Sequence, residues 1–174
     1  MRGAVLGLLL LGLPATASAA EGRQFDERYD HRGAVGLLFG SGGAGVSLGA
    51  TPAIFGLRWT QELGGTYAID VNGNELVLAL RGSITPEPRI YGLSGGYRGY
   101  FGYERVKTFI DLQVAAYVSP TFLIGPRVGA GVQFELSPLV GVFAGGAVNL
   151  GFGNGLLLSG ELLAGLQLRS YLLE

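Results

Sequence analysis

The chain has 174 residues, a formal net charge of −1 at pH 7, no cysteine, and 32 glycines, and 14% of its residues are charged. This length suits one domain. The charge balance offers no electrostatic basis for binding nucleic acid, and the lack of cysteine excludes a disulfide framework.

The first twenty residues have the pattern of a secretory signal peptide. Arg2 supplies a positive charge, residues 5–13 form an apolar segment that ends before Pro14, and Ala17-Ser18-Ala19-Ala20 has the small residues of a cleavage site. The apolar segment is too short to cross a bilayer as a helix. We therefore predict that residues 1–20 are a cleaved export signal.

Residues 21–32 (EGRQFDERYDHR) differ from the rest of the chain. They are rich in charge, they contain the only histidine, His31, and they show no apolar period. We predict a solvent-exposed mature N-terminal tail before the first strand. A partner-binding role for this tail is the alternative.

Residues 33–174 are predicted to form one β-domain, because apolar residues recur at every second position along it. The predicted strands span residues 33–41, 46–50, 53–71, 75–81, 89–104, 106–118, 122–136, 139–151 and 156–173. Gly42-Gly43 is a candidate two-residue turn, Asn72-Gly73 is a strong hairpin signal, and residues 83–88 read as a loop with two prolines. Merging the first hairpin gives eight strands and splitting the segment 53–71 gives ten; we predict eight.

The apolar face of these strands is predicted to face lipid. The strands are longer than the five to six residues usual in soluble proteins and long enough to cross a bilayer at a tilt. Aromatic residues lie near both ends of the apolar faces, as expected for the interfacial girdles of a membrane barrel. The predicted girdle consists of Tyr91, Phe101, Tyr103, Phe122 and Phe134.

The other face combines glycine with sparse charge, which suits a narrow lumen better than a water-exposed surface. An unpaired charge in a narrow lumen is costly, so these charges are expected to pair across it. The predicted lumen charge network consists of Arg58, Glu62, Arg98, Glu104, Asp111, Arg127, Glu135, Glu161 and Arg169. Glu75 and Arg81 also fall on the polar face of their strand, and glycines on this face leave room for larger neighbours.

The chain resembles the small bacterial outer-membrane β-barrel proteins of the OmpA, OmpX and OmpW kind. The resemblance covers the chain after Arg32 and rests on the export signal, the alternation, the aromatic placement and the lack of cysteine. It implies an all-β fold: a closed, antiparallel, up-and-down transmembrane β-barrel in the outer membrane. Two features depart from the pattern. The chain ends Tyr171-Leu172-Leu173-Glu174 rather than in an aromatic residue, and every turn is predicted to be short.

We expect a non-catalytic outer-membrane protein with a structural or small-solute passage role. The expected partners are outer-membrane lipid and the barrel-assembly machinery during biogenesis, with no nucleic acid, no obligate protein partner, no metal and no cofactor. One alternative is a secreted or periplasmic soluble β-barrel that binds an apolar ligand. A third hypothesis, an outer-membrane lipid-modifying enzyme, needs His31 to lie beside a serine at the membrane rim.

Overall fold

The computed structural model describes residues 31–43, 58–85, 89–102, 105–119 and 121–171. They form eight strands: β1 (Ala34–Gly43), β2 (Trp59–Ala68), β3 (Glu75–Thr85), β4 (Tyr91–Phe101), β5 (Val106–Ser119), β6 (Leu123–Ser137), β7 (Val140–Gly153) and β8 (Leu156–Tyr171). Within these ranges no helix is long and apolar enough to span a membrane.

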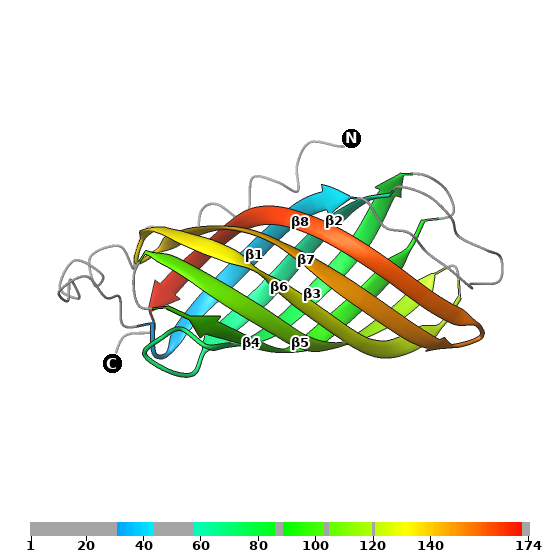
Figure 1. Cartoon of the computed structure of the whole chain (residues 1–174), viewed down its shortest axis with the longest axis horizontal. Coiled ribbons are helices and arrows are strands. Elements are labelled where there is room, and N and C mark those ends of the chain that lie inside the picture. The colour runs from blue at the N-terminus through cyan, green and yellow to red at the C-terminus, as the bar shows by residue number, and fades with distance from the viewer. Residues whose placement is uncertain (1–30, 44–57, 86–88, 103–104, 120, 172–174) are drawn as a thin grey trace, which may run out of the picture.

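The strands close into a single antiparallel barrel (Figure 1). Each strand pairs with the next along the chain, and β8 closes the barrel against β1 from Ala34↔Tyr171 to Ser41↔Ala164. The prediction of an all-β, closed up-and-down barrel with eight strands is confirmed, and the ten-strand alternative is wrong. An even number of strands places the start of β1 and the end of β8 at the same end, which we call the terminus side; the opposite end is the loop side.

The period-two pattern dictates which side chains point inward. In β5 the alternation is nearly complete, with Phe109, Asp111 and Gln113 buried between exposed Ile110, Leu112 and Val114. Successive residues of a strand point to opposite faces, so in a closed barrel one set fills the lumen and the other covers the outside. The apolar set is outside, and Leu78, Leu80 and Leu162 are each more than 60% exposed.

The turns on the terminus side are short and follow local sequence signals. The Asn72-Gly73 signal is confirmed: Gly73 has a φ of 86° and its amide donates to the Asp70 carbonyl at 3.1 Å. Asn74 reinforces the turn through its backbone amide, which donates to Asp70 Oδ1 at 3.0 Å. This turn connects β2 to β3, and Ser137 and Val140 bracket a similarly short turn between β6 and β7.

The prediction of a turn at Gly42-Gly43 was wrong. Gly42 and Gly43 do not form a turn, because β1 continues through them and they pair with Thr60 and Trp59. A Cβ atom on Gly42 would lie 2.0 Å from the Leu162 carbonyl oxygen, so glycine is needed here for close strand approach. β1 ends at Gly43 and β2 begins at Trp59; the predicted strand 46–50 and the start of the predicted strand 53–71 lie outside the described residues.

One loop boundary also differs from the prediction. The loop predicted for residues 83–88 begins later, because Ser83 to Thr85 continue β3. The Ser83 amide donates to the Ile90 carbonyl at 2.8 Å, and the Ile90 amide donates to Ser83 Oγ at 2.7 Å. These paired bonds extend the β3–β4 ladder to the loop-side rim, which local sequence signals did not indicate.

Candidate functional site

The lumen carries all the charge of the barrel wall: every charged residue within the eight strands points inward, and only Glu161 among them is partly accessible. From the loop side inward, acidic and basic side chains alternate across the lumen. We call this set the charge ladder; it consists of Glu62, Arg81, Glu161, Arg127, Asp111 and Arg98.

The charge ladder joins strands that are distant in sequence. Arg81 pairs with Glu62 and also donates through Nη1 to Glu161 Oε2 at 2.8 Å. Arg127 lies 3.6 Å from both Glu161 and Asp111 and links them. Since each buried charge has a neighbour of opposite sign, the desolvation cost of placing it in a narrow lumen is offset.

Arg98 ends the ladder with a two-bond contact to Asp111. Its Nε and Nη2 donate to the two carboxylate oxygens of Asp111 at 2.6 and 2.9 Å, a bidentate pair. The guanidinium also lies over the Phe109 ring, 4.3 Å from the centroid, and 5.4 Å from that of Phe143. Phe109 and Phe143 form an apolar layer with Leu38 and Tyr100.

Glycines on the neighbouring strands make room for this apolar layer. A Cβ atom on Gly131 would lie 2.5 Å from the Phe109 ring, and one on Gly165 would lie 2.7 Å from the Phe143 ring. The glycines of the polar face therefore accommodate large aromatic neighbours inside the lumen. Side chains of the strands therefore fill the lumen at this level.

A second polar cluster fills the lumen on the terminus side of the apolar layer. We call it the polar plug; it consists of Thr66, Glu75, Gln133, Glu135, Gln167, Arg169 and the hydroxyl of Tyr100, whose ring belongs to the apolar layer. In β3, β4, β6 and β8 the plug residues lie on the terminus side of the ladder residue of the same strand. The lumen thus has a ladder, an apolar layer and a plug in sequence.

The polar plug is densely hydrogen-bonded. Gln167 Nε2 donates to Glu75 Oε1 at 2.7 Å, and Arg169 Nη1 donates to Glu135 Oε2 at 2.7 Å. Gln133 Nε2 donates to both Glu135 and Gln167, at 3.0 and 2.9 Å. A buried network of this kind is rigid when its members are satisfied, because opening it exposes several unpaired polar groups at once.

His31 closes the terminus side, which corrects the prediction of a solvent-exposed histidine. It is fully buried just before β1, and its Nδ1 lies 3.0 Å from the Tyr171 hydroxyl. That hydroxyl donates to the Pro138 carbonyl at 3.1 Å, so Nδ1–H is the donor to Tyr171. Burial, together with the charges of Arg169 and Lys107, lowers the pKa of His31 to about 2, so the ring is neutral at ordinary pH.

The β2–β3 turn packs over the same end. Lys107 Nζ donates to the Asn72 carbonyl at 3.0 Å, and the Tyr100 amide donates to Asn74 Oδ1 at 2.6 Å. Gly73 packs against the His31 ring, since a Cβ there would lie 3.0 Å from it. The turn and the histidine together cover the terminus side of the polar plug.

The structure places the predicted lumen residues in different parts of the lumen. Glu62, Arg98, Asp111, Arg127 and Glu161 belong to the charge ladder, and Glu135 and Arg169 belong to the polar plug. Arg58 is buried at the loop-side mouth, apart from both. Glu104 lies outside the described residues.

Several lumen residues were missing from the predicted network. Glu75 and Arg81 were placed on the polar face but not in the network, and Lys107, two residues before Phe109, shares the inward phase of β5. The phase of the alternation alone would have found these three. Tyr100, Gln133 and Gln167 also point inward, but an uncharged residue gives no sequence signal of membership in a plug.

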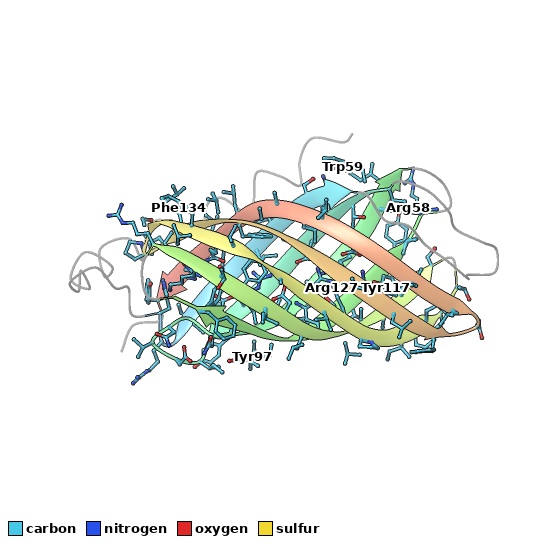
Figure 2. The ribbon with its side chains drawn as sticks, viewed as in Figure 1. Arg58, Trp59, Tyr97, Tyr117, Arg127 and Phe134 are labelled. Atoms are coloured by element: carbon cyan, nitrogen blue, oxygen red, sulfur yellow. The ribbon has the colours of Figure 1, made fainter. Side chains whose placement is uncertain are left out.

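Of the predicted girdle, Tyr91, Phe101, Phe122 and Phe134 point outward and are 41–56% exposed, and Tyr103 lies outside the described residues. Tyr91 and Phe122 lie at the loop side, and Phe101 and Phe134 lie near the terminus side. Figure 2 shows Phe134 on the outer surface together with Trp59 and Tyr97, which the prediction did not include.

Two spaces inside the described part of the barrel are small. A cavity at the loop-side mouth has a volume of about 50 Å³, and one beside Asp111 and Arg127 has a volume of about 10 Å³. The smaller one is at the limit for a single water molecule. In the part of the chain that the structure describes, no cluster of histidine and acidic side chains is suited to a metal ion.

Comparison with known proteins gives the fold. No family model and no curated protein matches the chain. Among solved structures, neisserial surface protein A (NspA) has a TM-score of 0.56 at 17% identity, covering 78% of this chain and 96% of its own. A structure from the de novo design of transmembrane β-barrels has a TM-score of 0.54 at 14% identity, covering 79% and 96%. Ail of Yersinia pestis has a TM-score of 0.49 at 16% identity, covering 78% and 99%.

The fold and the arrangement of side chains define a class. The chain is an eight-stranded, closed, antiparallel β-barrel that is apolar outside and polar inside, with the architecture of NspA and of the designed transmembrane barrels. At these identities the likeness establishes the fold, and the function has to be argued from the barrel itself.

Proposed function

We propose that the protein is an integral outer-membrane β-barrel with a closed lumen and a structural, non-catalytic role. One observation carries the proposal: large apolar side chains face outward on every strand, whereas the charged residues of the strands face the lumen. Soluble proteins rarely expose apolar patches larger than a few hundred Å². A closed barrel satisfies all its strand hydrogen bonds internally, as a bilayer requires.

The ends of the barrel support the same orientation in a membrane. Arg32 and Arg105 at the terminus side and Arg89 at the loop side are exposed, and they lie outside the strands. Outward aromatic residues sit inside these charges at both ends, as in membrane barrels. The short β2–β3 and β6–β7 turns on the terminus side match the periplasmic turns of such barrels.

The closed lumen favours a structural role over passage of solutes. A molecule moving through the barrel has to cross the charge ladder, the apolar layer and the polar plug in turn. Each of these is built from buried side chains that contact one another across the lumen. Passage therefore requires disruption of paired charges, which costs several kcal/mol per pair.

The lipid-modifying enzyme hypothesis receives no support from the position of His31. Its neutral ring donates to Tyr171 and its Nε2 lies 3.8 Å from Glu135, inside the terminus side of the barrel. A catalytic histidine for acyl transfer has to reach a nucleophilic hydroxyl that the substrate can also reach. His31 is instead part of the barrel closure.

Fractionation of cells that express the full-length chain tests the proposal. We expect the protein in the outer-membrane fraction, extraction only with detergent, and faster migration on a gel when the sample is not boiled. Release of a folded protein by osmotic shock would refute the proposal and favour a soluble barrel. In planar bilayers we expect no conductance steps; steps that persist with the purified wild type would assign a solute-passage role instead.

A further inference from the structure

The buried polar atoms that lack a hydrogen-bond partner are concentrated on the loop side of the apolar layer. Among the residues that the structure describes, the side chains with such atoms on this side include Ser94, Arg98, Gln113, Tyr117, Arg127 and Asn149. In the polar plug, by contrast, Glu75 Oε2 is the one such atom among the described residues. Buried polar atoms in native proteins are almost always hydrogen-bonded, to protein or to ordered water. The loop-side half of the lumen therefore needs partners that its own side chains do not supply.

These atoms are of both kinds, donors and acceptors. Gln113 is 5% exposed, and neither its amide nitrogen nor its amide oxygen has a partner within the described part of the chain. Arg127 adds two donors, Nε and Nη1, and Asn149 adds an acceptor, Oδ1. An anion would satisfy the donors alone, and a cation would satisfy the acceptors alone. Water both donates and accepts, and buried waters bond to groups of this kind.

The spacing within the charge ladder also favours water. Arg98 and Arg81 contact Asp111 and Glu161 directly, at 2.6 and 2.8 Å. Arg127 lies 3.6 Å from each of the same two carboxylates, which is too long for a direct hydrogen bond. At such a separation a water molecule beside the pair can bond to both groups. Arg127 (labelled in Figure 2) is thus the ladder residue that water has to complete.

One cross-strand row of inward residues connects the polar plug to the loop-side mouth. Each member pairs with the next: Thr66, Val77, Gly96, Gln113, Arg127, Asn149 and Ser159. Because the strands of a barrel tilt, a row across them also rises along the barrel axis. From Gln113 onward every member is polar, and Ser159 lines the mouth cavity. The unpaired atoms therefore form a continuous path from the interior to the mouth.

The two cavities mark the ends of this path. One water needs about 10–15 Å³ on this measure, so the mouth cavity of about 50 Å³ holds about three or four waters. The cavity of about 10 Å³ beside Asp111 and Arg127 is also lined by Phe109 and Phe143 of the apolar layer. These rings offer water no hydrogen bond in their plane. Beyond them, Gln167 and Arg169 of the polar plug bond to protein groups.

We propose that the loop-side half of the lumen is a blind, water-filled channel. Water enters at the mouth, bonds in turn to Ser159, Asn149, Arg127 and Gln113, and stops at the apolar layer. The inference rests on the closed lumen of the proposed function. It divides that lumen into a half that exchanges with solvent on the loop side and a dry half behind the apolar layer.

Three buried glutamines serve as matched probes, because Gln113 lies on the path and Gln133 and Gln167 lie in the polar plug. The full-length chain, labelled with 15N at glutamine side chains, is studied by NMR in dodecyl maltoside. We expect the Gln113 side-chain amide to show cross-peaks with water. After transfer to D2O it should exchange about a hundredfold faster than that of Gln167, because Gln167 Nε2 first has to lose its bonds to Glu75 and Thr66. Gln113→Leu identifies the Gln113 signal by its loss.

A second pair of variants tests the floor of the channel. Phe143 is 6% exposed and belongs to the apolar layer, whereas Phe152 of the same strand points outward and is 51% exposed. Phe143→Ala should accelerate exchange at Gln167, and Phe152→Ala should leave it unchanged. Gel mobility without boiling checks that each variant is folded.

Protection of Gln113 as strong as that of Gln167, without water cross-peaks, would overturn the proposal and leave the closed barrel intact. Water cross-peaks at all three glutamines would overturn both the blind channel and the closed lumen. Unchanged exchange at Gln167 in folded Phe143→Ala would overturn the apolar layer as the floor.

Discussion

Replacement of an outward residue by arginine at two depths tests the membrane assignment most directly. Leu112 lies in the middle of β5, points outward and is 55% exposed, and Val106 begins the same strand, points outward and is 59% exposed. The two positions share a strand, a face and nearly the same exposure. Both are aliphatic, and their main difference is their position along the barrel, so the comparison isolates depth.

The structure sets the expected loss of stability for each arginine variant. Six residues separate Val106 from Leu112, and at ~3.3 Å per residue and a tilt of ~40° this separation projects to about 15 Å along the barrel axis. The apolar band of a membrane barrel is about 25 Å tall, so Leu112 lies near its middle when Val106 lies at its edge. We expect Leu112→Arg to lower the free energy of unfolding by about 2–4 kcal/mol and Val106→Arg by about 0–1 kcal/mol.

The assay is equilibrium unfolding by guanidinium chloride in phospholipid vesicles. Trp59 is the single tryptophan of the chain, and it is outward-facing and 51% exposed, so its emission reports transfer from lipid to water. If both arginine variants lower stability by the same small amount, the outer face does not contact hydrocarbon. That result would refute the membrane assignment even if the barrel itself were intact.

Three further predictions concern the lumen. Arg98→Met should destabilise the barrel by about 3–5 kcal/mol in the same assay, because buried Asp111 loses both hydrogen bonds of its bidentate partner and keeps only Arg127, 3.6 Å away. The double variant with Asp111→Leu should recover most of the loss; equal stability of the single and double variants would contradict this. Arg169→Ala should produce conductance steps in planar bilayers that the wild type lacks, because its bond to Glu135 at 2.7 Å is lost; a silent variant would mean that the remaining plug suffices. Stability should fall below about pH 6.5, because the unfolded chain binds a proton at His31 that the folded chain, where burial lowers the pKa to about 2, does not. Unfolding of His31→Gln across pH 4–7 should show a shallower decline, and an unchanged decline would place the titration elsewhere.

The strands and the strongest turn could be predicted because their signals are local. Alternation along β5 identified which side chains share a face, and Asn72-Gly73 marked a turn since glycine adopts positive φ there without steric cost. Gly42-Gly43 also resembled a turn in the sequence, but β1 continues through both residues. Gly42 permits the close approach of β1 to Leu162, and a contact across so many residues leaves no trace in the local pattern.

The pairing of the lumen charges could not be predicted from the sequence either, because the partners are distant along the chain. Arg81 and Glu161 are 80 residues apart in the chain, and their contact depends on the closure of β8 against β1 and on the stagger between strands. Closure also buries His31. The end of β8 brings Tyr171 beside this residue, which the polar sequence around it had predicted to be solvent-exposed.

The sequence by itself therefore determined that this chain forms long, two-faced strands with charge on one face and apolar side chains on the other. That information lies in the identity of every second residue and needs no distant partner. Only the tertiary structure decided that the polar face is divided into a charge ladder, an apolar layer and a polar plug. Those units arise from contacts across the lumen, and the register with which the eight strands close sets which side chains meet.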